Sequence, residues 1–97
     1  MNYLKPWFAN TSPSFVEELG REVVPGHALS GANVTPIARR RDRDDVLFAL
    51  LDGTDRLAAV HLTYARRSDP NYPTVRLFAN FGEWEEAMKI DHQGWAS

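Results

Sequence analysis

The stretch from Arg56 to Ala65 (RLAAVHLTYA) constrains the fold most, because it is the longest run typical of a strand that is apolar on both sides. Successive side chains of an extended chain point to opposite faces. One face would carry Leu57, Ala59, His61, Thr63 and Ala65, and the other Ala58, Val60, Leu62 and Tyr64. We therefore predict that this stretch is the central strand of a sheet, with His61 as its polar exception.

Length and composition indicate what kind of protein contains this strand. The chain has 97 residues, of which 43% are hydrophobic and 25% charged, which predicts one domain over 1–97 with one core between two layers. It has no cysteine, so disulfides, thiolate catalysis and cysteine-bound metals are excluded. Neither a signal-like apolar run nor a stretch of roughly 18 apolar residues is present, so we expect a cytoplasmic protein without a membrane partner.

Residues 1–10 form an aromatic arm, with Tyr3, Leu4, Trp7 and Phe8 grouped around Pro6. So much apolar surface predicts that the arm docks, either on its own core or on a second subunit.

A helix is predicted over 12–24. Ser14 and Glu17 have the spacing of a capping box, and Ser12 followed by Pro13 is the alternative start. The apolar face would consist of Phe15, Val16, Leu19 and Val23. Pro25 and Gly26 would then end the helix.

The sheet is predicted over 34–79. Residues 34–41 and 45–51 resemble two antiparallel strands joined by a charged turn, and Pro36 predicts a sheet edge for the first, because proline has no amide donor. The second is apolar on both faces and belongs inside the sheet. Asp52 and Gly53 provide the turn into the strand that begins at Arg56, and 74–79 form a short last strand.

A second helix is predicted over 80–95, capped by Asn80 with Glu83 three residues later. Its sheet-facing stripe would be Phe81, Trp84, Met88, Asp91 and Trp95. The predicted fold is α+β: an antiparallel meander of three or four strands, with an N-terminal and a C-terminal helix packed on it. Whether the helices cover one face or both is left open.

Three strings resemble a group of small bacterial hypothetical proteins without established activity. They are DDVLF (44–48), AVHLTY (59–64) and EWEEAMKIDH (83–92). The resemblance implies a small, stand-alone α+β domain of bacterial origin, and it implies no site.

No reaction is indicated by the polar residues. His27, His61 and His92 lack the spacing of paired metal ligands, so a metal site would need them brought together from separate elements with Asp91 or another carboxylate. No activated nucleophile is recognisable. We expect no metal, no cofactor and no catalytic residue.

Arginines cluster at Arg39–Arg41, Arg43 and Arg66–Arg67, and whether they converge is left open. Aspartates are interleaved with them and the net charge is −2, so we predict no nucleic-acid binding.

Two functional hypotheses remain. The first is a non-catalytic binding or interaction module that forms a homodimer or holds a protein partner through exposed aromatics at both ends. The alternative is a small enzyme or ligand-binding protein with His61, Thr63 and Asp91 lining a pocket between sheet and helix. In that pocket Asp91 would pair with His61, or else with Arg76 or a backbone N–H. An open polar pocket at His61 would favour the alternative, and a flat apolar patch the first hypothesis.

Overall fold

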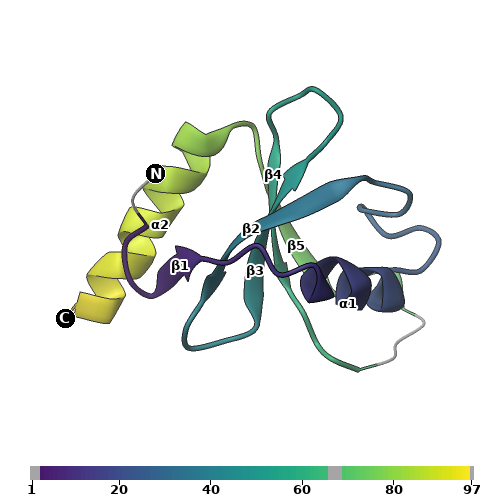
Figure 1. Cartoon of the computed structure of the whole chain (residues 1–97), viewed down its shortest axis with the longest axis horizontal. Coiled ribbons are helices and arrows are strands. Elements are labelled where there is room, and N and C mark those ends of the chain that lie inside the picture. Colours follow the sequence, from purple (N-terminus) through teal and green to yellow (C-terminus); the bar gives the residue numbers. More distant parts are fainter. Residues whose placement is uncertain (1–2, 66–68, 97) are drawn as a thin grey trace.

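The computed structural model describes residues 3–65 and 69–96, which form an antiparallel sheet of five strands with two helices (Figure 1). The strands follow one another in space as they do in sequence, β1-β2-β3-β4-β5. The predicted α+β class is confirmed. The elements are β1 (Trp7–Ala9), α1 (Ser14–Glu22), β2 (Val34–Arg40), β3 (Asp45–Leu50), β4 (Leu57–His61), β5 (Thr74–Phe78) and α2 (Phe81–Ala96).

The predicted count of three or four strands is wrong, because the N-terminal arm contributes β1. Trp7 of β1 lies opposite Arg40 of β2, so β2 is not at the edge of the sheet. Pro36 is nevertheless accommodated. It lies outside the segment that pairs with β1, and the β2–β3 register shifts between Pro36 and Ala38. A missing amide donor is tolerated at such an irregularity.

The middle strand of the sheet is β3, so the prediction that 56–65 forms the central strand is wrong. The strand formed by this stretch, β4, is also shorter than expected. β4 ends at His61, and Tyr64 has a φ of 52°, a left-handed conformation that does not continue a strand. The strand therefore covers 57–61 of the predicted 56–65, and Thr63 lies beyond its end.

Each face of the sheet carries its own buried cluster. α1 covers one face, where Phe15 and Leu19 pack with Phe48 and Val60. The opposite face carries Trp84 and Met88 of α2, packed with Trp7, Leu47 and Phe78. This arrangement follows from β3, whose consecutive residues Val46, Leu47 and Phe48 are all buried and must point to alternate faces.

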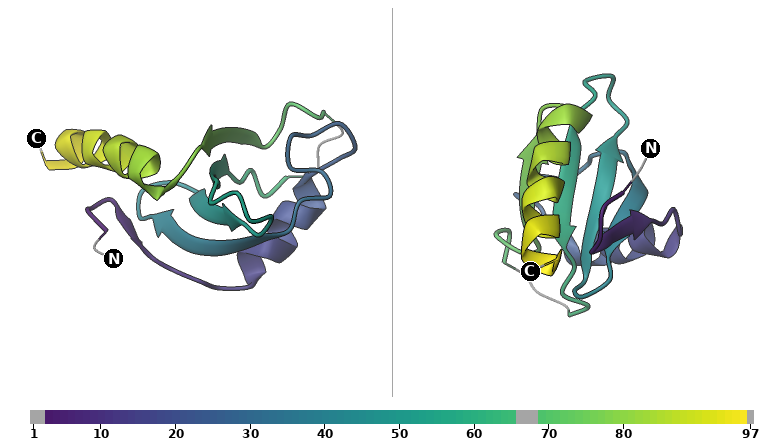
Figure 2. Two further views of the ribbon diagram at one scale, coloured as in Figure 1. Left: turned by 90° about the horizontal axis from the view of Figure 1, so that it is seen from above. Right: turned by 90° about the vertical axis from the view of Figure 1, so that its left-hand side faces the viewer.

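The helices lie on opposite faces and toward opposite ends of the molecule (Figure 2). The predicted placement of the C-terminal helix along the sheet is wrong for its last turn, since Trp95 of the predicted stripe is 45% exposed. Asn80 caps α2 as predicted, because its Oδ1 accepts a hydrogen bond of 2.9 Å from the Glu83 amide. In α1, Pro13 occupies the N-cap position without a side-chain bond, so the predicted Ser14–Glu17 capping box is absent.

None of the helices in the described part of the chain has the length and apolarity needed to cross a bilayer.

Candidate functional site

His61 and Asp91 line the same pocket, which has a volume of about 270 Å³ and lies between β4, β5 and α2. Its polar wall is made by Asp45, His61, Thr74, Arg76 and Asp91. Its aromatic wall is made by Trp7, Phe78 and Trp84. Of the three predicted ligand-binding residues the pocket contains two, and Thr63 is elsewhere.

The strand register assembles the polar wall. His61 of β4 lies opposite both Asp45 of β3 and Thr74 of β5, so these three side chains point to the same face of the sheet. Arg40 follows Arg39, which lies opposite Val46, so Arg40 continues the row beside Asp45. The chain thus places a row of polar side chains across the ends of four adjacent strands, β2 to β5.

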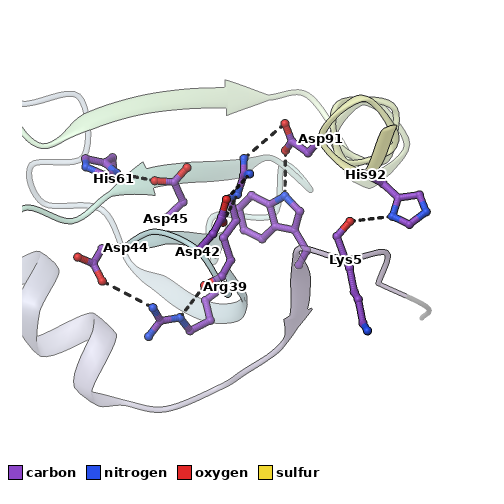
Figure 3. Close-up of polar contacts among 10 residues, drawn as sticks. Lys5, Arg39, Asp42, Asp44, Asp45, His61, Asp91 and His92 are labelled. Atoms are coloured by element: carbon purple, nitrogen blue, oxygen red, sulfur yellow. Dashed lines mark hydrogen bonds and ion pairs between the residues drawn. The ribbon is translucent and has the colours of Figure 1, made fainter. Parts of the chain in front are cut away.

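His61 is held by a carboxylate. Its Nδ1 contacts Oδ1 of Asp45, a bond that Figure 3 shows within the sheet. A carboxylate can only accept, so Nδ1 carries the proton and Nε2 is the nitrogen left for a ligand.

Asp91 has different partners from those predicted. Trp7 Nε1 donates to its Oδ2 at 2.9 Å, and Arg40 Nη1 lies 3.5 Å from its Oδ1 (Figure 3). The predicted pairing of Asp91 with His61 is therefore wrong, as is the alternative with Arg76. The reason is the course of α2: the helix carries Asp91 to β1, whose existence as a strand the sequence pattern did not indicate.

Arg40 links this corner of the pocket to the turn after β2. Its Nε and Nη2 each donate to Asp42 at 2.9 Å, in addition to the ion pair with Asp91. Burial lowers the pKa of Arg40, but the surrounding Asp42, Asp91 and Asp45 outweigh that effect and raise it above its ordinary value. The guanidinium of Arg40 is therefore permanently charged and already compensated.

Arg76 is the uncompensated charge of the pocket. Its guanidinium carbon lies 4.9 Å from the centroid of the Phe78 ring, a cation–π contact. No carboxylate of residues 3–65 and 69–96 lies within ion-pair distance of it. The cation is thus positioned on an aromatic ring at the pocket wall and is open to an anion.

Thr63 belongs to a separate structural contact. Its amide and its hydroxyl donate to Oε1 of Glu22 at 2.8 and 2.6 Å, and the amide of Tyr64 donates to Oε2 at 2.9 Å. Glu22 is buried on α1, so it anchors the chain after β4 to that helix. The prediction for Thr63 assumed a strand that continues to residue 65, whereas β4 ends at His61.

Sequence reasoning missed Asp45 and Trp7 as pocket residues, and it named Arg76 only as an alternative partner of Asp91. Asp45 could have been found by counting the β3–β4 hairpin register from its turn, which places it opposite His61. The importance of Arg76 could have been inferred from its place as the only charge in the short strand TVRLF, two residues from Phe78. Nothing in the local pattern indicated Trp7.

The three histidines occupy separate places. His27 Nε2 contacts the Pro73 carbonyl at 2.8 Å, His92 Nδ1 contacts the Lys5 carbonyl at 2.8 Å, and His61 contacts Asp45. In the described residues no three potential ligand side chains come together as a metal site.

The arginines of the β2–β3 turn are engaged locally. Arg39 lies 3.6 Å from Asp44, Arg40 is bound to Asp42, and Arg41 lies over the Phe8 ring at 5.6 Å. Arg66 and Arg67, whose convergence with these arginines was left open above, lie outside the described residues.

The expected exposed aromatics are present at only one end. Trp7 is 4% exposed and packs on the chain's own core, edge-to-face with Trp84 at 5.3 Å between ring centroids. The prediction that the N-terminal arm docks is therefore confirmed, on its own core. Trp95 of α2 remains exposed. No family model, curated protein or solved structure matches the chain.

Proposed function

We propose that this protein is a non-catalytic binding domain whose ligand presents an anionic group to Arg76 in the pocket beside His61. The proposal is based on which charged side chains of the pocket already have a partner. Asp45 is paired with His61, and Asp91 with Trp7 and Arg40, whereas Arg76 has no ion pair among the described residues. An anion in the pocket would give Arg76 an ion pair.

A carboxylate or a similar planar anion suits this cation best. The guanidinium group presents parallel N–H donors that match a carboxylate in a two-point contact. The Thr74 hydroxyl and the Nε2 atom of His61 are on the same wall and add polar contacts. The site is therefore selective for the charged end of its ligand.

The rest of the ligand is small and apolar. Phe78 and Trp84 line the pocket, and Trp84 is buried against the sheet, so this wall is rigid. A volume of about 270 Å³ is slightly below that of typical small-molecule sites, which begin at roughly 300 Å³. It suits a small organic acid or a single acidic or aromatic group.

Acid–base catalysis by His61 is the second candidate, favoured by the Asp45 contact that orients the imidazole as in many general bases. It ranks below binding because, among the described side chains, no hydroxyl forms a hydrogen bond with Nε2 of His61. A general base also needs a nucleophile or a substrate group positioned so that the base can remove its proton.

The test is an NMR titration of the backbone amides with benzoate, and in parallel with benzyl alcohol as a neutral molecule of similar shape. We expect benzoate to shift the amides of 74–78 and 84–91 saturably and benzyl alcohol to have a much weaker effect. Arg76→Gln should weaken benzoate binding about fivefold, the effect of losing about 1 kcal/mol of an exposed charge contact.

Arg41→Gln is the matched control, because Arg41 is also exposed and stacked on a phenylalanine but lies outside the pocket. It should bind benzoate like the wild type. Equal binding of benzoate by the Arg76→Gln variant, or tighter binding of benzylammonium than of benzoate, would contradict the proposal.

A further inference from the structure

β5 is the open edge of the sheet. It is the last strand in the order β1-β2-β3-β4-β5, and the other edge is the three-residue strand β1. An edge strand presents unpaired backbone groups that can bind an added strand. The edge of β5 borders the pocket, because Thr74, Arg76 and Phe78 belong to both.

The register identifies the outward backbone groups. The Leu62 amide donates to the Asp44 carbonyl at 3.0 Å, so Leu62 directs its backbone groups toward β3. Inward and outward residues alternate along an antiparallel strand, so Val60 also faces β3 and faces away from β5. Its partner on β5 is Val75. Val75 and Leu77 therefore direct their N–H and C=O groups away from the sheet.

The start of this edge is closed. Pro73, two residues before Val75, has no amide donor, and its carbonyl is bound by Nε2 of His27 at 2.8 Å. The outward carbonyl of Pro73 is thus already hydrogen-bonded before the strand begins. In contrast, no described group is bonded to the outward N–H and C=O groups of Val75 and Leu77. The open part of the edge coincides with Arg76.

The side chains along β5 specify what an added strand must carry. Arg76 points to the pocket face, and Val75, which packs with the α1 cluster, points to the other face together with Leu77. Leu77 is 45% exposed. An added antiparallel strand with an acidic residue opposite Arg76 would place its two neighbouring residues opposite Val75 and Leu77, where apolar side chains would cover Leu77.

We infer that the partner is an extended peptide segment of apolar–acidic–apolar pattern, which pairs with β5 as an added antiparallel strand and directs its carboxylate to Arg76. This inference rests on the proposed anion site and names the source of the anion. Its two contributions are separable: the backbone bonds belong to Val75 and Leu77, and the charge contact belongs to Arg76.

Two other roles of the β5 edge are distinguishable from peptide binding: protection against strand pairing, and pairing with a second copy of the chain. A charged residue on an edge strand can serve to prevent strand pairing, and Arg76 would then be protective. A second copy of the chain could also pair through β5. A two-fold axis at Arg76 would bring two guanidinium groups together, which disfavours this register.

The experiment measures binding of a blocked peptide, threonine–valine–glutamate–valine–threonine, by calorimetry and by amide hydrogen exchange of the protein. The wild type should bind it with slowed exchange at Val75 and Leu77. Lysine in place of glutamate should abolish measurable binding. Methylation of both valine nitrogens, which removes two backbone donors, should weaken binding roughly tenfold. Arg76→Gln should weaken it about fivefold, and Arg41→Gln should leave it unchanged.

The outcomes separate this inference from the proposed function. Equal binding of the methylated and unmethylated peptides would overturn strand addition, while the benzoate result would still support the anion site. No peptide binding, together with dimerisation of the Arg76→Gln variant in sedimentation, would show that Arg76 only protects the edge. A wild-type dimer that blocks the peptide would make a second copy the occupant, and would also overturn the inference.

Discussion

Individual carboxylates in this protein act through the donors that surround them, and Glu22 is the clearest example. Burial raises the pKa of Glu22, but hydrogen bonds from Glu18, Thr63 and Tyr64 outweigh burial and lower it below its ordinary value. Glu18 shows the opposite shift, since the hydrogen bond with Glu22 and burial raise its pKa. Of the two carboxyl groups, Glu22 is therefore the more easily ionised, and its carboxylate accepts the hydrogen bonds from Thr63 and Tyr64.

Replacing Glu22 should produce a pH-dependent loss of stability. A lowered folded-state pKa contributes stability above the unfolded pKa, near 4.5, and that contribution is lost as pH falls through the folded pKa. Glu22→Gln keeps the oxygen acceptor but removes the charge, so we expect a loss of about 2 kcal/mol at pH 7. The difference from wild type should shrink below pH ~4.

Urea unfolding at pH 7 and at pH 3.5 measures this difference. Glu17→Gln is the control, because Glu17 is exposed on the same helix. A difference that stays constant between the two pH values would mean that the charge of Glu22 does not stabilise the contact with Thr63 and Tyr64.

At the scale of elements, the N-terminal arm shows why a local sequence pattern can predict that a segment docks without predicting that it docks as a strand of the sheet. Its aromatic content predicted burial, which is correct. Its pairing with β2 connects residues 29 to 33 positions apart through only three residue pairs, too few to produce a period-two pattern. The hairpins β2–β3 and β3–β4 were predictable because the residues of each turn directly follow one strand and precede the next, so the signal is local in the sequence.

Trp7 holds this arm in place and should be one of its most sensitive positions. The side chain is buried, packs against Trp84 and donates to Asp91. We expect Trp7→Ala to lower the free energy of unfolding by about 3–5 kcal/mol, the usual cost of truncating a buried aromatic.

Asp91→Ala isolates the polar part of the same contact. It leaves the indole N–H without its acceptor, so we expect a loss of about 1–2 kcal/mol. Asp44→Ala, which removes an exposed carboxylate that is ion-paired with Arg39, is the control. Chemical denaturation measures all three variants, and a Trp7→Ala variant as stable as the control would contradict the assignment of the arm to the core.

At the scale of the whole molecule, sequence reasoning was successful where information is local and failed where it depends on packing. The α+β class, the Asn80 cap and the shared pocket of His61 and Asp91 followed from periodicity and turn residues. The partner of Asp91 depends on the direction in which α2 crosses the sheet, which no spacing encodes. The role assigned to Thr63 failed because the strand was assumed to continue past His61.

The charges of the pocket also depend on the whole molecule, because they come from separate elements. Asp45, His61 and Arg76 come from three strands, and Asp91 from α2. Their combined pairing leaves Arg76 without an ion pair among the described residues. The whole fold therefore determines that Arg76 is available to an anion.

The most direct measurement of that claim is the side-chain Nε–H resonance of Arg76 in a ¹H–¹⁵N spectrum recorded during benzoate addition at low ionic strength. A charge-assisted hydrogen bond to a carboxylate should move this resonance downfield and saturably, and added salt should reverse the shift. The Arg41 Nε–H resonance should stay in place. An Arg76 resonance that does not move while amides elsewhere respond to benzoate would contradict the proposed site.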